Sequence, residues 1–256
     1  MSTTDDKQPG ITIFRGWKDF GKHVWSPFVI KLEARLRFAG VKYAVDVGSP
    51  KTAPKGKIPY VECTSLPVAA AAAGPEGKVQ LSDSTLIIKA LSEWDVTPDI
   101  NAVLSPAGRA KDMALRALLE DKLYFYHALP YPVRILVGML VYRSTVATLH
   151  GQGTGRYSAE EIAGFRQEIW ESVNDLLVES RTKSTSDSAG SQEPFWVFGG
   201  EKPTEADATL FGFIVSVLVS TAGPDSQKVV RSFPVVLDYA RKIQDKYFPD
   251  YESWSL

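Results

Sequence analysis

Residues 23–36 read HVWSPFVIKLEARL, and this stretch decides the fold because it marks the change from a strand to a helix. It follows residues 11–17, ITIFRGW, whose alternation and β-forming side chains predict a strand. Ser26 stands where a helix N-cap is expected, and Pro27 suits the first helical position because it has no N–H to leave unpaired. Apolar residues then recur at near-helical spacing as far as Gly40, a typical helix end: Phe28, Val29, Leu32, Leu36 and Ala39. The simplest interpretation of Ser26 is capping, and the alternative is that its hydroxyl also takes part in chemistry.

The overall composition is that of an ordinary globular protein. Of 256 residues, 44% are apolar and 23% are charged, and the formal net charge is −1. This length allows one large domain or two modest ones. A chain without excess positive charge lacks the basic surface that phosphate binding requires, so we expect no nucleic-acid partner.

Cysteine and histidine give no signal for a disulfide framework or a metal. Cys63 is the only cysteine and is expected to be an unreactive strand residue. The three histidines, His23, His127 and His150, are scattered and show no ligand spacing. We therefore expect no metal site.

Neither the polar N-terminus nor the most apolar run of the chain predicts insertion into a membrane. Residues 1–10, MSTTDDKQPG, are polar and predict a flexible tail rather than a signal or transit peptide. The most apolar run, residues 133–142, is too short to cross a bilayer and contains Arg134. We expect no transmembrane segment and a cytoplasmic location.

The remaining pattern divides the chain in two. Residues 11–95 predict a small α/β unit, with further strands at 43–48, 59–63 and 78–82 and a second helix over 82–94. Residues 96–105 are a linker by composition, and residues 106–256 predict a helical domain. The candidate helices span 109–127, 134–149, 160–179, 205–221 and 234–248, with a mobile Ser-rich loop near 181–193.

Four short motifs then stand at places where one family carries them. They follow the first strand, open the third strand, open the second helix and begin a late helix: Ser26-Pro27-Phe28, Lys57-Ile58-Pro59-Tyr60, Ser82-Asp83-Ser84, and Thr204 with Asp207. Together they resemble the cytosolic glutathione S-transferases, above all the branch that contains failed-axon-connections and metaxin-like proteins. The resemblance implies an N-terminal thioredoxin-like domain followed by an all-helical C-terminal domain. Thr204 and Asp207 match the family's capping box, which we interpret as structural.

The resemblance also implies glutathione as the cofactor and Ser26 as the catalytic residue. A free thiol has a pKa near ~8.5, and lowering it by about two units requires roughly 2.7 kcal/mol of preference for the thiolate. A helix N-terminus and a donated hydroxyl supply stabilisation of that size, on the order of 1.5–3 kcal/mol for the hydroxyl. Phe14 and Trp17 at the end of the first strand have no hydroxyl to offer in place of Ser26.

The other site residues follow from the same resemblance. Ile58, before an expected cis Pro59, would pair its backbone with the cysteinyl part of glutathione. Asp83 and Ser84 would receive the γ-glutamyl end, and Lys57 or Lys55 the glycine carboxylate, because the segment before the third strand is too short for the family's usual second helix. The expected substrate pocket for an apolar electrophile contains Phe28, Arg116, Tyr124 and Tyr126, with Tyr131 a further candidate.

Two classes of function remain open. The first is an enzyme that adds the thiolate to a conjugated apolar electrophile or isomerises it. The resemblance implies a place in secondary metabolism, where fungal members of this branch work. The second is a non-catalytic protein of the same fold, used for contacts with other proteins or to carry a ligand. A homodimer is expected by analogy in the first case.

Overall fold

The computed structural model describes residues 10–64, 78–127, 151, 153–184, 192–221 and 223–254. Its sheet has the order β2-β1-β3-β4, formed by β1 (Gly10–Phe14), β2 (Ala44–Asp46), β3 (Tyr60–Thr64) and β4 (Lys78–Ser82). β2 runs parallel to β1, whereas β1–β3 and β3–β4 are antiparallel. All four predicted strands are present. The first is shorter than expected and ends at Phe14, two residues before Gly16 adopts a positive φ of 85°.

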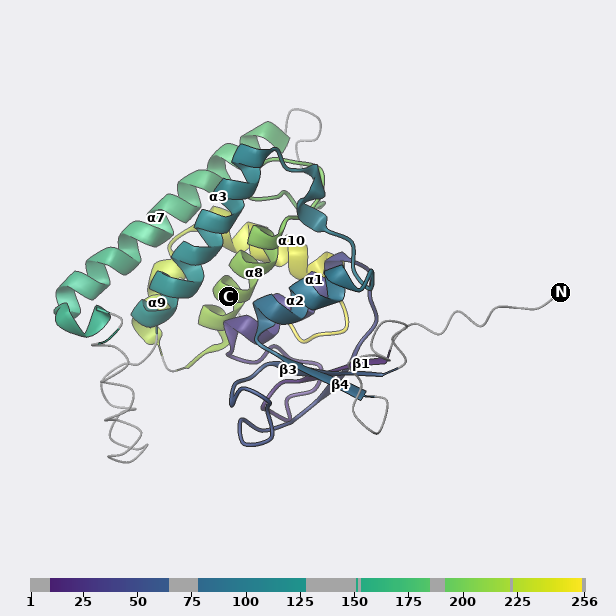
Figure 1. Cartoon of the computed structure of the whole chain (residues 1–256). Coiled ribbons are helices and arrows are strands. Elements are labelled where there is room, and N and C mark those ends of the chain that lie inside the picture. Colours follow the sequence, from purple (N-terminus) through teal and green to yellow (C-terminus); the bar gives the residue numbers. More distant parts are fainter. Residues whose placement is uncertain are drawn as a thin grey trace.

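Helices α1 (Pro27–Phe38) and α2 (Ser84–Glu93) lie on one face of this sheet, toward the helical part of the molecule (Figure 1). The strands supply that face with apolar side chains such as Ile13, Val61 and Val79, because successive residues point to opposite sides. The opposite face carries Thr12, Glu62 and Gln80, which pair across the three strands. The sheet therefore has one apolar and one polar face.

Helix α1 belongs to both hydrophobic cores. Leu32 and Leu36 pack in the core of the sheet, while Ile30 and Ala34 pack in the core of the helical half. The two expected domains thus meet over a single helix, and nearly every side of that helix is covered.

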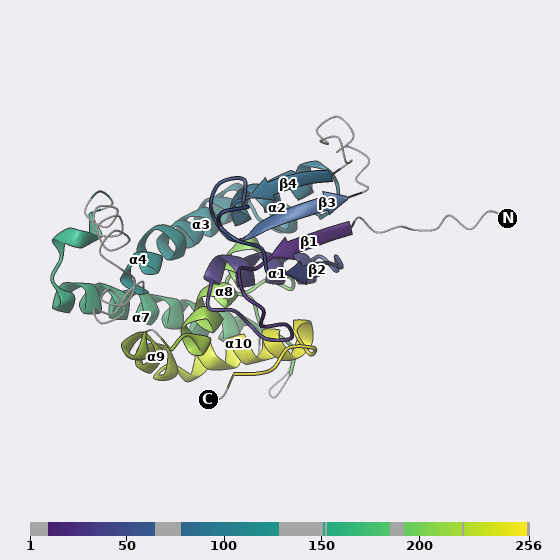
Figure 2. The same ribbon diagram turned by 90° about the horizontal axis from the view of Figure 1, so that it is seen from below.

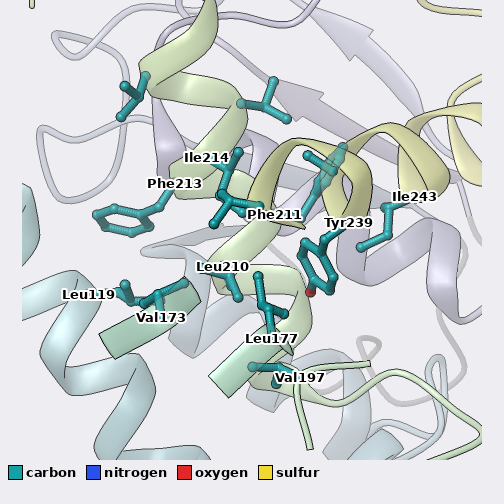
Figure 3. Close-up of a cluster of buried hydrophobic side chains, with 14 of the residues drawn as sticks. Leu119, Val173, Leu177, Val197, Leu210, Phe211, Phe213, Ile214, Tyr239 and Ile243 are labelled. Carbon is teal, nitrogen blue, oxygen red and sulfur yellow. The ribbon is translucent and has the colours of Figure 1, made fainter. Parts of the chain in front are cut away.

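The helical half has α8 at its centre. Its elements are η2 (Ile100–Val103), α3 (Pro106–Ala117), the π-helical turn η3 (Leu118–Leu123), α4 (Tyr124–His127), η4 (Thr154–Arg156), α7 (Ala159–Ser184), α8 (Glu205–Val219), α9 (Pro224–Arg231) and α10 (Pro234–Tyr247). Figure 2 shows these helices from below, with α8 between α1 and α10. Leu210, Phe213 and Ile214 of α8 are surrounded by side chains from the other helices, among them Leu119, Val173 and Tyr239 (Figure 3).

The predicted capping box is present at the start of α8. The Asp207 carboxylate accepts from the N–H and the hydroxyl of Thr204, each at 2.7 Å. It also accepts from Val197 N–H at 2.7 Å and the Tyr239 hydroxyl at 2.9 Å. Burial raises the pKa of Asp207 to about 6. These residues tie α8 to its neighbours, which is the structural role expected of them.

Two helical predictions differ from the structure. α7 continues to Ser184, four residues into the stretch expected to be a mobile loop, and α9 was not among the candidate helices. The candidate helix at 134–149, together with Tyr131 and His150, lies outside the described residues. Within the described ranges, no single helix is long and apolar enough to cross a membrane; α8 and α9 pass that test only as a pair bent by 120°.

Candidate functional site

Three of the motifs lie in segments that enter or leave the sheet at the same edge. The strand register places Phe14, Tyr60 and Ser82 in one row, because Phe14 pairs with Tyr60 and Tyr60 with Ser82. The chain leaves β1 after this row toward Ser26, enters β3 from Ile58 and Pro59, and leaves β4 into Asp83 and Ser84. The sheet thus brings these separate segments to the same edge.

Ser26 occupies the N-cap of α1, but its hydroxyl does not cap the helix. Its backbone is extended, with φ −81° and ψ 115°, and its carbonyl accepts from the Ile30 N–H at 3.2 Å. The side chain makes no capping hydrogen bond, and the residue is 8% exposed. The interpretation of Ser26 as a capping hydroxyl is therefore wrong. Among the described residues the hydroxyl has no hydrogen-bond partner, and it stands at a helix N-terminus, where backbone N–H groups favour negative charge.

The Ile58–Pro59 peptide bond is cis, as expected. Pro59 is buried, and no hydrogen bond between described backbone groups involves Ile58. Gly16, just after β1, lies close to it: a Cβ at Gly16 would stand 3.5 Å from Cγ1 of Ile58. The backbone before β3 therefore borders the segment that leads from β1 to Ser26.

Asp83 caps α2 from an uncommon backbone conformation. Its φ is 77°, a region that non-glycine residues rarely adopt and that occurs often at functional sites. Oδ1 of Asp83 accepts from the N–H groups of Thr85 at 3.1 Å and Leu86 at 3.2 Å. Ser84 is buried beside it. Since Asp83 already uses two of the helix N–H groups, a bound carboxylate would have to rely on Ser84.

The segment between β2 and β3 contains turns and no helix, as its length predicted. Lys55 and Lys57 are exposed there, directly before Ile58. Thr52 anchors this loop through a 3.0 Å hydrogen bond between its hydroxyl and that of Tyr60. This hydrogen bond anchors the loop that carries the two lysines.

The four expected substrate-pocket residues do not form one group. The rings of Phe28 and Tyr124 are in contact, with centroids 5.1 Å apart, and Phe28 also meets Phe213 at 6.0 Å. Tyr126 instead stacks on Phe165 of α7 at 5.8 Å. Arg116 forms an ion pair with Asp112, with 2.7 Å between Nε and Oδ2, and lines a pocket with Lys31 and Thr85. Of the four residues, Phe28 and Tyr124 are the two whose side chains the described contacts bring together.

Other ionisable groups are buried along α1 and in the segment that precedes it. The Glu33 carboxylate lies 3.2 Å from Nε of Arg15 and accepts from the Tyr251 hydroxyl at 2.9 Å, and burial raises its pKa to about 7. His23 bonds to Gln244 at 2.6 Å, and burial lowers its pKa to about 4. Within the described residues, no three His, Cys, Asp or Glu side chains are grouped as metal ligands.

Comparison with known families agrees with this geometry. The family model of the glutathione S-transferase N-terminal domain matches residues 27–131, a range that includes the cis proline and the start of α2. The fold is that of the glutathione S-transferases.

The comparison includes two similar sequences and one similar structure. Failed axon connections of Drosophila melanogaster is 25% identical over 260 residues, covering 89% of this chain; the chain spans 55% of the length of that relative. Isoprene-epoxide–glutathione S-transferase of Rhodococcus sp. strain AD45 is 23% identical, covering 93% of this chain and 99% of the relative. A maleylacetoacetate isomerase of Anaeromyxobacter dehalogenans with bound glutathione superposes with a TM-score of 0.51 at 13% identity, covering 95% of both chains.

Sequence reasoning missed two features of this transferase fold near the site. Trp17 and Trp25 form an edge-to-face pair, with centroids 4.6 Å apart, directly before Ser26. Lys31 is buried in α1 and bonded to residues of two other elements. A lysine between Ile30 and Leu32 was the available signal, because a lysine on a helix that is covered on all sides requires partners.

Proposed function

We propose that this chain is a glutathione-dependent enzyme that activates the thiolate of glutathione for addition to a conjugated apolar electrophile. The observation that carries the proposal is the Ser26 hydroxyl, which has no hydrogen-bond partner among the described residues. It stands at a helix N-terminus, at the sheet edge from which Ile58–Pro59 and Asp83–Ser84 also open. An enzyme that must stabilise a thiolate needs a donor and a positive helix end at one point.

Each part of glutathione has a counterpart at this edge. The backbone of Ile58 pairs with the cysteinyl unit, Asp83 receives the γ-glutamyl ammonium, and Ser84 its carboxylate. Lys57 receives the glycine carboxylate. The anchored loop and the hydrogen bonds of Asp83 support this arrangement, because both hold their groups in place before a ligand arrives.

The reaction begins when the thiol loses its proton to solvent. The resulting thiolate accepts a hydrogen bond from the Ser26 hydroxyl. The sulfur then forms a C–S bond with an electron-poor carbon. In an addition, the displaced π electron pair moves onto the conjugated acceptor, which takes a proton from solvent; in a substitution, the electron pair departs with the leaving group. Phe28 and Tyr124 provide an aromatic surface for the electrophile.

Two outcomes are open to such an adduct. If it keeps the C–S bond, the reaction is a transfer, as the name of the Rhodococcus relative indicates for that protein. If the thiolate leaves again after rotation about the former double bond, the reaction is a cis–trans isomerisation. We also propose that the enzyme is a cytoplasmic homodimer that acts in fungal secondary metabolism. These three points rest on the family resemblance alone.

The test uses two Ser-Pro N-caps of the same chain. Ser105 caps α3 before Pro106, and its hydroxyl accepts from Gly108 N–H at 3.1 Å, unlike that of Ser26. Glutathione is added to the wild type, Ser26→Ala and Ser105→Ala, and the thiolate absorbance is followed against pH. We expect the pKa of the bound thiol to rise by about one to two units in Ser26→Ala, since one hydrogen bond to a charged group is lost.

The matched control separates chemistry from capping. Ser105→Ala should leave the thiol pKa unchanged and lower the free energy of unfolding by about 1 kcal/mol, the usual cost of losing a cap. An unchanged pKa in Ser26→Ala would contradict the proposed role of Ser26. Binding of glutathione without any thiolate band would favour the non-catalytic carrier, and no binding would favour a protein used only for contacts with other proteins.

A further inference from the structure

Lys31 is an almost fully buried lysine in the helix that begins at Ser26. Only 1% of it is exposed, although Lys is rarely buried without a partner. Its Nζ donates to Oγ1 of Thr85 at 2.8 Å and to Oε1 of Glu120 at 2.7 Å. These contacts compensate part of the cost of removing an ammonium group from water.

The acceptor Glu120 lies in the π-helical turn η3. This turn interrupts the helical run between α3 and α4, and such turns occur often at functional sites. The hydroxyl of Thr209 on α8 donates to the same oxygen of Glu120 at 3.1 Å. The Glu120 carboxylate that fixes Lys31 is therefore itself held by α8, the fourth element of this network.

The other acceptor, Thr85, belongs to the first turn of α2. It follows Ser84 directly, and its own N–H is bonded to Asp83. Lys31 thus links the helix that begins at Ser26 to the helix that begins at Asp83 and Ser84. It also lines a 290 Å³ pocket beside Thr85, together with Arg116, Glu205 and other residues of these helices.

We propose that Lys31 is a positioning residue for the γ-glutamyl end of glutathione, an inference that rests on the proposed function. Its hydrogen bond holds the first turn of α2 in place against α1. Because the ammonium group is paired with Glu120, Lys31 acts by fixing this turn and not by adding net charge to it. Lys31 acts through Thr85 and Ser84 and does not itself touch the thiol.

The experiment measures the dissociation constant of glutathione by calorimetry in the wild type and in five variants. Lys31→Met removes the ammonium, and Thr85→Val removes one acceptor at an exposed position while the Lys31–Glu120 pair remains. Lys89→Met is the matched control, because Lys89 lines the same pocket but is mainly exposed, and its ion pair with Glu93 is long, at 3.8 Å. Ser84→Ala, alone and combined with Lys31→Met, tests whether the two residues act on the same group.

We expect Lys31→Met and Thr85→Val to weaken glutathione binding about tenfold, the effect of losing a hydrogen bond that involves a charged group. Lys89→Met should change it less than about twofold, as usual for an exposed pair. Lys31→Met combined with Ser84→Ala should bind about as weakly as Ser84→Ala alone. The pKa of the bound thiol should stay at its wild-type value in Lys31→Met, since only Ser26 and its helix end stabilise the thiolate.

The inference is overturned if folded Lys31→Met binds glutathione like the wild type, or if its effect adds fully to that of Ser84→Ala. A shifted thiol pKa in Lys31→Met would also overturn it, because Lys31 would then act on the whole of α1. If Lys31→Met does not fold, Thr85→Val decides, and wild-type affinity in that variant contradicts the inference. A wild-type protein that does not bind glutathione would instead refute the proposed function, and the role of Lys31 with it.

Discussion

Gly212 lies where α8 crosses α1, and replacing it with alanine tests how tightly the two halves are joined. A Cβ at this position would stand 2.6 Å from the carbonyl oxygen of Pro27 and 2.9 Å from the backbone nitrogen of Lys31. Because Cβ atoms essentially never approach other atoms closer than 3.0 Å, the two backbones must move apart by a few tenths of an ångström. Both obstructing atoms belong to the backbone, so no side-chain rotation relieves the contact.

The magnitude follows from two opposing effects. Overpacking of this kind costs about 1–3 kcal/mol, and alanine in a helix interior gains about 0.5–1 kcal/mol over glycine. We therefore expect Gly212→Ala to lower the free energy of unfolding by about 1–2 kcal/mol. Since the obstruction lies at the first residue of α1, the substitution should also displace Ser26 and raise the pKa of a bound thiol.

Urea unfolding followed by circular dichroism measures the effect. Gly164→Ala in α7 is the control, because an added Cβ there has no neighbour within 4 Å among the described residues. That variant should gain about 0.5–1 kcal/mol from helix propensity alone. If Gly212→Ala is as stable as the wild type, or gains stability as Gly164→Ala does, α1 and α8 are not packed as closely as the distances indicate.

Three further predictions concern single groups. Because burial raises the pKa of Glu33 from 4.5 to about 7, the folded state binds this proton more tightly than the unfolded state, and this group's contribution to stability falls as pH rises from about 4.5 to 7. Glu33→Gln should therefore gain stability relative to the wild type over that range in denaturation at several pH values, and a difference that does not depend on pH would contradict this. Cys63 is fully buried, with its pKa raised by burial to about 11, so a disulfide reagent should label it only as fast as the protein unfolds; labelling within minutes in the folded state would refute this. Asp83→Asn keeps the acceptor for Thr85 and Leu86 but loses the charge, so stability should change by less than about 0.5 kcal/mol while glutathione affinity falls about tenfold; equal affinity would place the γ-glutamyl ammonium elsewhere.

Much of the fold could be predicted because its signals are local. The Ser26-Pro27 pair, the alternation in the strands and the capping box at Thr204 and Asp207 depend on residues a few positions apart in the chain. The order of strands and helices follows from them, and with it the thioredoxin-like half and the helical half. Boundaries were less certain, as at the end of α7, because the last turns of a helix are decided by what packs against them.

The site was predictable as a set of segments but not as a set of contacts. The sequence by itself determined that Ser26, the cis Ile58–Pro59 bond and Asp83–Ser84 stand at element ends, and the order of the elements implied that these ends meet. Only the tertiary structure decided that the Ser26 hydroxyl makes no cap, that Tyr124 but not Tyr126 meets Phe28, and that Lys31 is buried. The physical reason is that a hydroxyl's partner, a ring's neighbour and a lysine's exposure depend on which distant elements lie against them. For Lys31 these elements are α2 and η3, which lie 54 and 89 residues away in the chain.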